Sequence, residues 1–347
     1  MTGSPLIDAA DVADILSRAQ YTFQALRGAR LFVTGCTGFF GRWLLAALEA
    51  ANLEQGAGIE VVALSRAPER FLATAPSLEN ARWLQFCRGD ARDYVAPEGA
   101  FSHFVHGATS TVNAAGPAAA AELADVITAG TAHVLEHAMR AKPQQLLYVS
   151  SGAVYGDQPS DLARVPEHFA GQPDPSRIES TYGLGKRAAE RLCLDAAEGG
   201  GPPPVLARCF AFAGPHLPLD AHFAFGNFLR DGLAGRPISV AGDGAAVRSY
   251  LYGTDLAEWL LTLLVRGEAR GAYNVGSDEP VSIADLAAAV GDHFGVPVSI
   301  ARAADPGAPR RRYVPNTSRA QSLGLRANVS LPEAIARSAA FHRARGL

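Results

Sequence analysis

A glycine-rich segment, Thr34–Gly41 (TGCTGFFG), constrains the fold of this chain more than any other feature. It lies between a short apolar run, 31–35, and a sequence typical of a helix, 41–54. In a strand–turn–helix unit, Gly35 permits a tight turn, Gly38 lets the backbone approach a pyrophosphate, and Gly41 lets the helix pack on the strand. The free N–H groups at the start of the helix then favour phosphates. The segment predicts a dinucleotide site, to which Thr37, Phe39 and Phe40 also belong.

Further apolar runs end in small or polar residues, and helical sequences separate several of them. The expected strands are 59–66, 83–90, 101–108 and 145–152, and the clearest helices are 117–141 and 181–197. Alternating strands and helices indicate a parallel sheet with helices on both faces. We therefore expect an α/β fold, a Rossmann-type doubly wound parallel sheet with a smaller C-terminal α/β substrate domain.

The expected domain boundaries follow from these patterns. Residues 1–28 form an N-terminal helical extension, because apolar positions in 8–27 recur with the spacing of an amphipathic helix. Residues 29–207 form the NAD(P)-binding domain, to which 248–272 are expected to return. Residues 208–347, where prolines interrupt the pattern, form the substrate-binding domain.

Composition excludes several classes of protein. The formal net charge is −3, so no basic field is available to hold nucleic acid. No apolar run reaches the roughly 18 residues of a membrane span, and the N-terminus lacks the pattern of a signal peptide. The four cysteines have no metal-binding spacing. We expect a cytoplasmic protein without a metal and with reduced, mostly buried thiols.

The second predicted strand ends at Ser65 and Arg66, without the acid that usually binds the ribose of NAD. Ser65 can donate to a phosphate, and Arg66 can pair with a 2′-phosphate. This end of the strand favours NADP over NAD as the cofactor. Asp90, at the end of the third strand, is a candidate acceptor for the adenine amino group.

The candidate catalytic residues are Ser151, Tyr182 and Lys186. Tyr182 and Lys186 are four residues apart, so they share a helix face. A nearby ammonium, together with the positive nicotinamide of an oxidised cofactor, would lower the pKa of the tyrosine from its ordinary value of about 10. A tyrosinate can remove the hydroxyl proton of an alcohol as hydride leaves, while Ser151 binds the same oxygen.

The segments TGCTGFFG, GDARD, HGAT, VSSGAVYG and YGLGK, in this order, resemble the extended short-chain dehydrogenases of the NAD-dependent epimerase/dehydratase family. The resemblance runs from about residue 29 onward. It implies a nucleotide-sugar enzyme in which Ser151, Tyr182 and Lys186 are the catalytic triad. It also places Ala108 at the cofactor and Ser110, Ser151 and Asn227 at the substrate. A homodimer, with helices 117–141 and 181–197 at its interface, is implied by the same likeness.

Two C-terminal segments strengthen this resemblance. GDGAAVRSYLYGTDLA (242–257) is similar to the family segment whose arginine binds the diphosphate of the nucleotide sugar, here Arg248. PRRRYVPNTSRA (309–320) is similar to a second phosphate-binding stretch, in which Arg312 matches best and Arg310 and Arg311 are possible substitutes. An arginine fork suits a diphosphate.

The chain departs from the family pattern at four positions. The family's 4,6-dehydratases carry Asp-Glu where this chain has Gly152 and Ala153, neither of which can move a proton. Ile127 and Ala211 stand where the family often has asparagine. We therefore expect altered substrate contacts and no dehydratase activity, although a dehydratase-like enzyme remains an alternative.

Two reactions share the expected machinery, hydride transfer at C4 or a nearby carbon of a nucleotide-diphosphate sugar. A 4-epimerase retains its cofactor, and a reductase of a 4-keto sugar consumes NAD(P)H. Rival hypotheses are a small-carbonyl reductase, which would not need Arg248 and Arg312, and a non-catalytic NAD(P)-binding scaffold, against which the intact triad argues.

Overall fold

The computed structural model describes residues 6–109, 116–221, 223–303, 305 and 310–346. Its centre is a seven-stranded parallel sheet with the order β11-β6-β5-β4-β1-β2-β3. The strands are β1 (Arg30–Thr34), β2 (Glu60–Ser65), β3 (Leu84–Arg88), β4 (His103–His106), β5 (Gln145–Ser151), β6 (Pro204–Cys209) and β11 (Ala272–Val275). The order reverses between β1 and β4, which is where doubly wound sheets bind their ligands. The predicted Rossmann-type fold is confirmed.

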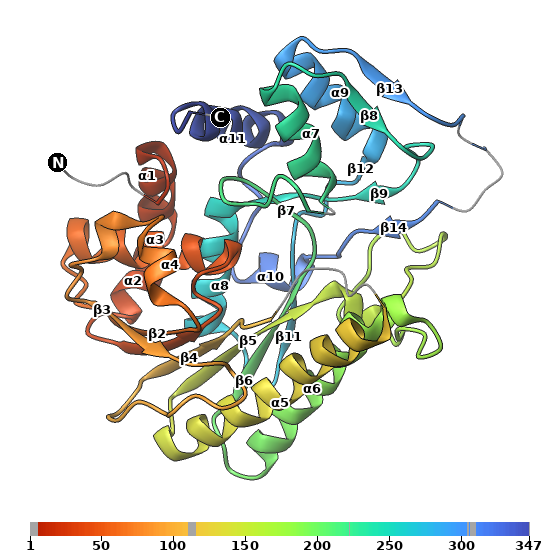
Figure 1. The fold of residues 1–347 in the computed structure, drawn as a ribbon. Helices are drawn as coiled ribbons and strands as arrows, with labels where there is room; N and C mark the ends of the chain where they lie inside the picture. Colours follow the sequence, from red (N-terminus) through yellow and green to blue (C-terminus); the bar gives the residue numbers. More distant parts are fainter. Residues whose placement is uncertain (1–5, 110–115, 222, 304, 306–309, 347) are drawn as a thin grey trace.

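Helices cover both faces of this sheet (Figure 1). Helices α5 (Pro117–Ala141) and α6 (Thr181–Glu198) pack together on one face. Helices α3 (Phe39–Gln55) and α8 (Gly253–Arg266) cover the other, and α4 (Pro68–Leu72) follows β2. Successive side chains of β1 point to opposite faces of the sheet. Phe32 therefore packs in the core under α5 and α6, while Leu31 and Val33 pack in the core under α3 and α8.

The N-terminal segment forms two helices rather than the single helix expected over 8–27. They are α1 (Ala9–Arg18) and α2 (Gln20–Ala25), separated at Ala19. Both contact α8. Arg18, at the end of α1, lies 3.2 Å from a carboxylate oxygen of Asp255 and 3.1 Å from one of Glu258, both on α8. The first helix therefore ends where its arginine meets two buried acids.

The C-terminal part forms a smaller lobe beside the carboxyl ends of the strands (Figure 1). Its helices are α7 (Ala224–Leu233), α9 (Ile283–Phe294) and α11 (Leu331–Arg343), whereas α10 (Ser318–Ser322) packs against β11 of the main sheet. Its strands are short: β7 (Phe212–Ala213) pairs with β10 (Leu251–Tyr252), β8 (Ile238–Val240) with β13 (Val298–Ile300), and β9 (Val247–Arg248) with both β12 (Val281–Ser282) and β14 (Arg312–Tyr313). One apolar core runs from the α3/α8 layer into this lobe through Phe225, Leu286 and Ile335. Within the described residues, no helix combines the length and apolar character needed to cross a membrane.

Candidate active site

The glycine turn adopts the geometry that its sequence predicts. Gly35 has a φ of +77°, and a Cβ there would lie 2.6 Å from the backbone of Gly107. A Cβ on Gly41 would lie 2.2 Å from the Cα of Cys36. Helix α3 begins directly after Gly38, and no side chain caps its N-terminus. The turn thus offers close backbone approach and free N–H groups, which fit a dinucleotide phosphate.

A buried hydrogen-bond chain holds the end of β4 against this turn. The Thr34 hydroxyl accepts bonds from the backbone N–H groups of residues 107 and 108, at 3.1 and 3.0 Å, and lies 2.7 Å from Nδ1 of His106. Nε2 of His106 lies 3.0 Å from the hydroxyl of Thr131, which itself donates to the Ile127 carbonyl. The Thr131 hydroxyl therefore accepts, so His106 carries its proton on Nε2. Burial lowers the pKa of His106 to about 3, so the ring stays neutral.

This arrangement fixes Ala108, a predicted cofactor contact, through its backbone N–H. His106 and Thr131 were not among the predicted site residues. The HGAT motif contains His106, but no local pattern indicates that Thr131, on a helix, would be its partner. Ser110, predicted to contact the substrate, lies outside the described residues.

The ends of β2 and β3 bring Ser65, Arg66 and Asp90 to one edge of the sheet. Ser65 is buried and accepts a bond from the backbone of Ala67, whereas Arg66 is exposed. Asp90 accepts 2.8 and 3.1 Å bonds from the side chain and backbone of Arg92. The hydrogen bond with the Arg92 side chain holds the pKa of Asp90 below its ordinary value, and the charge of Arg66 acts in the same direction. Asp90 is thus an ionised, arginine-bound acceptor, and its adenine contact stays a prediction.

Ser151, Tyr182 and Lys186 meet at the carboxyl end of β5. Ser151 is the last residue of that strand, and its Oγ accepts a 3.1 Å bond from the backbone of Ala153. The buried Lys186 ammonium donates to the carbonyl of Val149 at 2.7 Å and lies 5.9 Å from the centre of the Tyr182 ring. The structure therefore brings the three predicted catalytic side chains together.

Burial dominates the proton affinities of this group. It raises the pKa of Tyr182 to about 12, against the opposing effect of a hydrogen bond with Ser151. Burial also lowers the pKa of Lys186 to about 8. Burial therefore outweighs any lowering of the Tyr182 pKa by its neighbours in the protein.

The space beside Gly152 is closed by two aromatic rings. A Cβ on Gly152 would lie 2.7 Å from the ring of Phe210 and 2.8 Å from the hydroxyl of Tyr313. The centres of the Phe210 and Tyr313 rings lie 4.5 Å apart with the rings tilted by 36°, and the Tyr313 hydroxyl lies 3.4 Å from that of Ser151. An acidic side chain at position 152 would displace these rings. Tyr313 is a site residue that the sequence reasoning missed, although it follows Arg312 directly.

The two predicted phosphate-binding arginines lie on opposite faces of their small sheet. Arg248 on β9 is paired in register with Tyr313 on β14, and its guanidinium carbon lies 5.9 Å from the centre of that ring. Arg312 precedes Tyr313, so its side chain leaves the opposite side of the strand. The Nε of Arg312 is buried and has no hydrogen-bond partner among the described residues. Arg310 and Arg311 are exposed.

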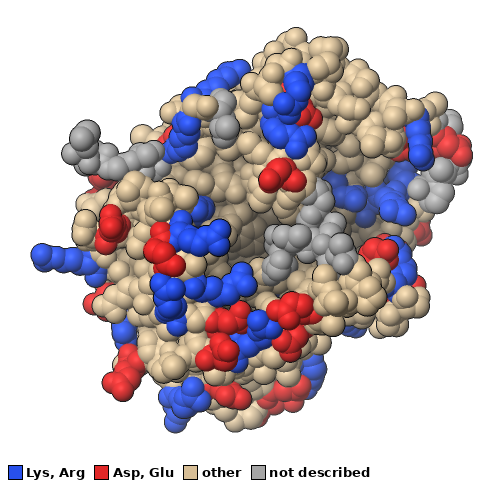
Figure 2. All heavy atoms as spheres, in the orientation of Figure 1, with Lys and Arg blue, Asp and Glu red and all other residues tan. Residues whose placement is uncertain are grey.

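Asn227 lies half-buried on α7, in the C-terminal lobe. Figure 2 shows a hollow between the two parts of the molecule, with basic side chains around its rim. Within the described ranges, no three His, Cys, Asp or Glu side chains gather so that they could hold a metal ion.

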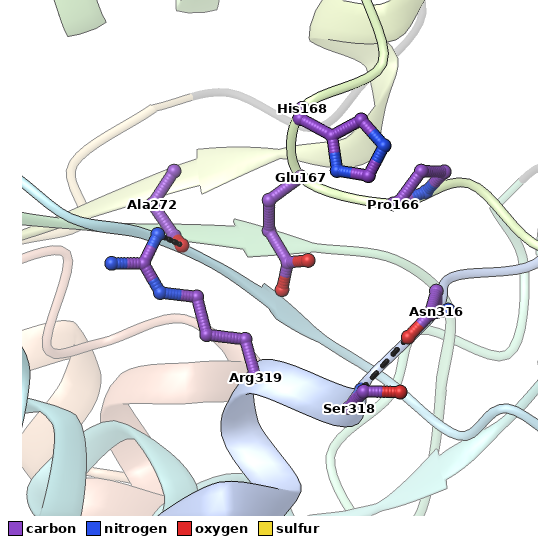
Figure 3. Close-up of a pocket in the computed structure, with 7 residues that line it drawn as sticks. All are labelled: Pro166, Glu167, His168, Ala272, Asn316, Ser318 and Arg319. Atoms are coloured by element: carbon purple, nitrogen blue, oxygen red, sulfur yellow. Dashed lines mark hydrogen bonds between the residues drawn. The ribbon is translucent and has the colours of Figure 1, made fainter.

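A separate pocket of about 440 Å³ lies beside β11, the edge strand of the main sheet. Figure 3 shows the Glu167 carboxylate below His168 and to the right of the Arg319 guanidinium, which donates to the carbonyl of Ala272. The pocket is lined by Pro166, Glu167, His168, Ala272, Asn316, Ser318 and Arg319. None of the predicted cofactor or catalytic residues lines it, so it is distinct from the candidate active site.

Comparison with known proteins shows which family shares this sequence and fold. The family model described as "NAD dependent epimerase/dehydratase family" matches residues 31–276. UDP-glucuronic acid decarboxylase 2 of Arabidopsis thaliana is 32% identical over 207 residues, which are 59% of this chain and 46% of that protein. The chain thus matches about half the length of this curated relative.

Two solved structures are similar over nearly the whole chain. MoeE5 in complex with UDP-glucuronic acid and NAD is 25% identical, with a TM-score of 0.75 and coverage of 92% of this chain and 100% of MoeE5. DesIV, a dTDP-glucose 4,6-dehydratase from Streptomyces venezuelae, is 25% identical, with a TM-score of 0.76 and coverage of 91% and 97%. The resemblance seen in the sequence motifs is confirmed: the chain belongs to the NAD-dependent epimerase/dehydratase family.

Proposed function

We propose that this chain is an NAD(P)-dependent enzyme that transfers hydride at C4, or a nearby carbon, of a nucleotide-diphosphate sugar. The observation that carries the proposal is the meeting of Ser151, Tyr182 and Lys186 at the same carboxyl edge of the sheet as the glycine turn. A scaffold that only binds a dinucleotide would not need a buried lysine next to a partly buried tyrosine. Membership of the family supports an enzyme.

The catalytic roles follow from the positions of the side chains. Tyr182 takes the proton of the sugar hydroxyl during oxidation and returns a proton during reduction. Ser151 binds the same sugar oxygen, and Lys186 supplies positive charge beside the tyrosine. A bound nicotinamide accepts and returns hydride, and its oxidised form adds the charge that favours the tyrosinate. Gly35, Thr37, Gly38, Phe39, Phe40, Gly41 and Ala108 would hold the dinucleotide.

The substrate class rests on the arginines. A buried guanidinium nitrogen without a partner, at Arg312, suits an anionic ligand, because burying an unpaired charged donor is costly. Arg248, beside Tyr313, would bind the diphosphate from the other side, and Asn227 and Ser110 complete the proposed substrate contacts. Because the relatives include proteins named for or bound to UDP-glucuronic acid, that sugar nucleotide is the first to test.

Dehydration is not part of the proposal. Gly152 and Ala153 carry no group that moves a proton, and the space at Gly152 is taken by Phe210 and Tyr313. The reaction left to the triad is hydride transfer with proton exchange, as in a 4-epimerase or a 4-keto-sugar reductase.

The cofactor proposed is NADP, because Ser65 and the exposed Arg66 stand where NAD-specific sites place an acid. Structures similar to this chain carry NAD, so both forms need testing. We also propose that residues 29–207 with 248–272 bind the cofactor, that 208–347 bind the sugar, and that a homodimer forms through α5 and α6.

The test begins with mass spectrometry of small molecules that copurify with the protein. A panel of UDP-, dTDP-, GDP- and CDP-sugars, with UDP-glucuronic acid first, then follows. An epimer formed without net cofactor consumption identifies an epimerase, and loss of NAD(P)H with a 4-keto sugar identifies a reductase. Turnover of small neutral carbonyls with no sugar nucleotide accepted would overturn the proposal.

A further inference from the structure

Glu190 is a buried carboxylate one helical turn beyond Lys186 on α6. Tyr182, Lys186 and Glu190 recur at four-residue spacing, so they lie on one face of the helix. The mechanism above gives Glu190 no role. A buried carboxylate is costly unless it is paired, so its partners matter.

Three hydrogen bonds satisfy this carboxylate. The Ser150 hydroxyl donates to Oε1 at 2.6 Å, and Arg208 donates from Nε to Oε1 at 2.9 Å and from Nη2 to Oε2 at 2.7 Å. Ser150 and Arg208 are direct neighbours across β5 and β6. The carboxylate thus joins the catalytic helix to two strands, at the residue immediately before the catalytic serine.

Arg208 is itself fixed by the elements around it. Its Nη1 donates to the hydroxyl of Tyr155 at 2.9 Å and to the carbonyl of Glu167 at 3.0 Å. The Tyr155 hydroxyl donates to Asn274 on β11 at 2.8 Å. The guanidinium therefore has little freedom, and it holds Glu190 in place.

Several groups face the Lys186 ammonium. They are Tyr148 and the Val149 carbonyl on β5, Cys209 on β6, His106 on β4, and Tyr182, Cys193 and Glu190 on its own helix. Burial raises the pKa of both thiols far above neutral, and His106 stays neutral. Among these groups, Glu190 is the carboxylate, and its charge favours the ammonium form of Lys186.

We propose that Glu190 is a positioning residue, which fixes the Ser150–Ser151 end of β5 against the catalytic helix and whose negative charge balances the Lys186 ammonium. This inference rests on the proposed function for its effect on turnover. It makes a separate claim about the protonation of Lys186, which needs no substrate.

The first experiment uses the composition of the chain, whose only two lysines are Lys142 and Lys186. Lysine labelled with carbon-13 at Cε gives two NMR signals, and Lys142→Arg identifies the exposed one. The Lys186 signal should titrate with a pKa of about 8 in the parent. In Glu190→Gln the titration should move to lower pH by on the order of one unit, because an anion that favours the charged lysine is gone.

Two variants keep this experiment decisive. The single change Glu190→Gln would leave the Arg208 guanidinium buried without its carboxylate, which could prevent folding. The double variant with Arg208→Gln removes that charge, so it should fold. Its Lys186 titration should also lie below that of the parent, by less than in the single variant, because the positive charge of Arg208 is removed together with the negative charge of Glu190. Ser150→Ala removes a hydrogen bond to Glu190 but no charge, so its Lys186 titration should match the parent. An unchanged titration in folded Glu190 variants would overturn the proposal.

The second experiment measures pH–rate profiles with the sugar nucleotide that the panel identifies. A lysine is charged below its pKa, so turnover by the parent should fall as pH rises through about 8. Glu190→Gln should move this fall to lower pH and reduce kcat about tenfold or more, with KM little changed. Ser150→Ala should reduce kcat without moving the fall.

A merely structural role for Glu190 would lower activity and leave the pH of this fall unmoved, which contradicts the proposal. If the parent turns over no sugar nucleotide, the proposed function fails. The NMR titration still decides whether Glu190 supports Lys186.

Discussion

The carboxyl edge of the main sheet and the short strands of the C-terminal lobe are built differently. At the sheet edge, Gly35 and Gly41 are held by backbone contacts, and Lys186 and Thr34 by buried hydrogen bonds. In the lobe, Arg248 and Arg312 stand on two-residue strands, and a buried nitrogen of Arg312 has no partner. The side chains of Lys186 and Thr34 at the sheet edge have their partners within the protein, whereas the lobe presents an arginine that a ligand would satisfy. This division suits a fixed reaction centre combined with adaptable substrate recognition.

The largest effect should come from the reaction centre. Tyr182→Phe removes the acid/base hydroxyl and keeps the ring, so turnover should fall by about 10²–10⁴. Cofactor binding, measured by calorimetry, should remain close to that of the parent. Turnover within a few-fold of the parent would break the assignment of Tyr182.

The substrate lobe should respond differently. Arg248→Ala should raise KM about 10- to 100-fold and change kcat little, because a diphosphate does not change during the reaction. Arg302→Ala is the matched control, since Arg302 is an exposed arginine of the same lobe outside the proposed phosphate contacts, and its KM should stay within about threefold of the parent. Steady-state kinetics check both. Equal effects of the two changes would remove the special role of Arg248.

The glycine turn offers a comparison within the sheet edge. A Cβ at position 41 would collide with the backbone of Cys36, so Gly41→Ala should lower the free energy of unfolding by about 1–3 kcal/mol and weaken cofactor binding. A Cβ at position 38 would meet only the Gly35 carbonyl oxygen at 3.6 Å, an ordinary contact. Gly38→Ala should therefore keep stability and weaken only cofactor binding. Thermal unfolding and calorimetry separate the two outcomes.

The preference for NADP(H) should depend on the exposed side chain of Arg66, so the change in cofactor affinity should be smaller than the effects above. Arg66→Ala should weaken NADP(H) binding about tenfold and leave NAD(H) binding nearly unchanged. Arg70→Ala, an exposed arginine on the following helix α4, is the control. A parent protein that strongly prefers NAD(H) in calorimetry would refute the phosphate role of Arg66.

The smallest expected effect concerns the docking of α1 on α8. Burial raises the pKa of Glu258 from 4.5 to about 7, against the opposing charge of Arg18. A carboxyl with a raised folded-state pKa binds its proton more tightly when folded, so stability falls as pH rises from about 4.5 through about 7. Burial lowers the pKa of His106, His137 and His216, and these groups make stability rise over the same pH range, so the test is a difference between two proteins. As pH rises, the Tm of the parent should fall by a few degrees relative to that of Glu258→Gln, and parallel curves would contradict the prediction.

The sequence predicted the sheet edge well because its signals are local. The glycine turn, the Ser-Ser strand end and the Tyr182–Lys186 spacing each lie within one short segment. The contacts that it missed join distant segments: Tyr313 with Ser151, His106 with Thr131, and Glu190 with Arg208. The break at Ala19 was missed for the same reason, because Arg18 meets acids on α8. The pattern of residues within one segment carries no information about which distant segment will contact it.

The central claim, hydride transfer at a sugar carbon, has one direct test. The protein is loaded with NAD(P)⁺ and mixed with each sugar nucleotide of the panel, while the near-ultraviolet absorbance of reduced nicotinamide is followed. We predict that at least one sugar nucleotide reduces the cofactor in the parent and that Tyr182→Phe slows this step by about 10²–10⁴. Product formation without any reduced nicotinamide, or equal rates in parent and variant, would contradict the claim.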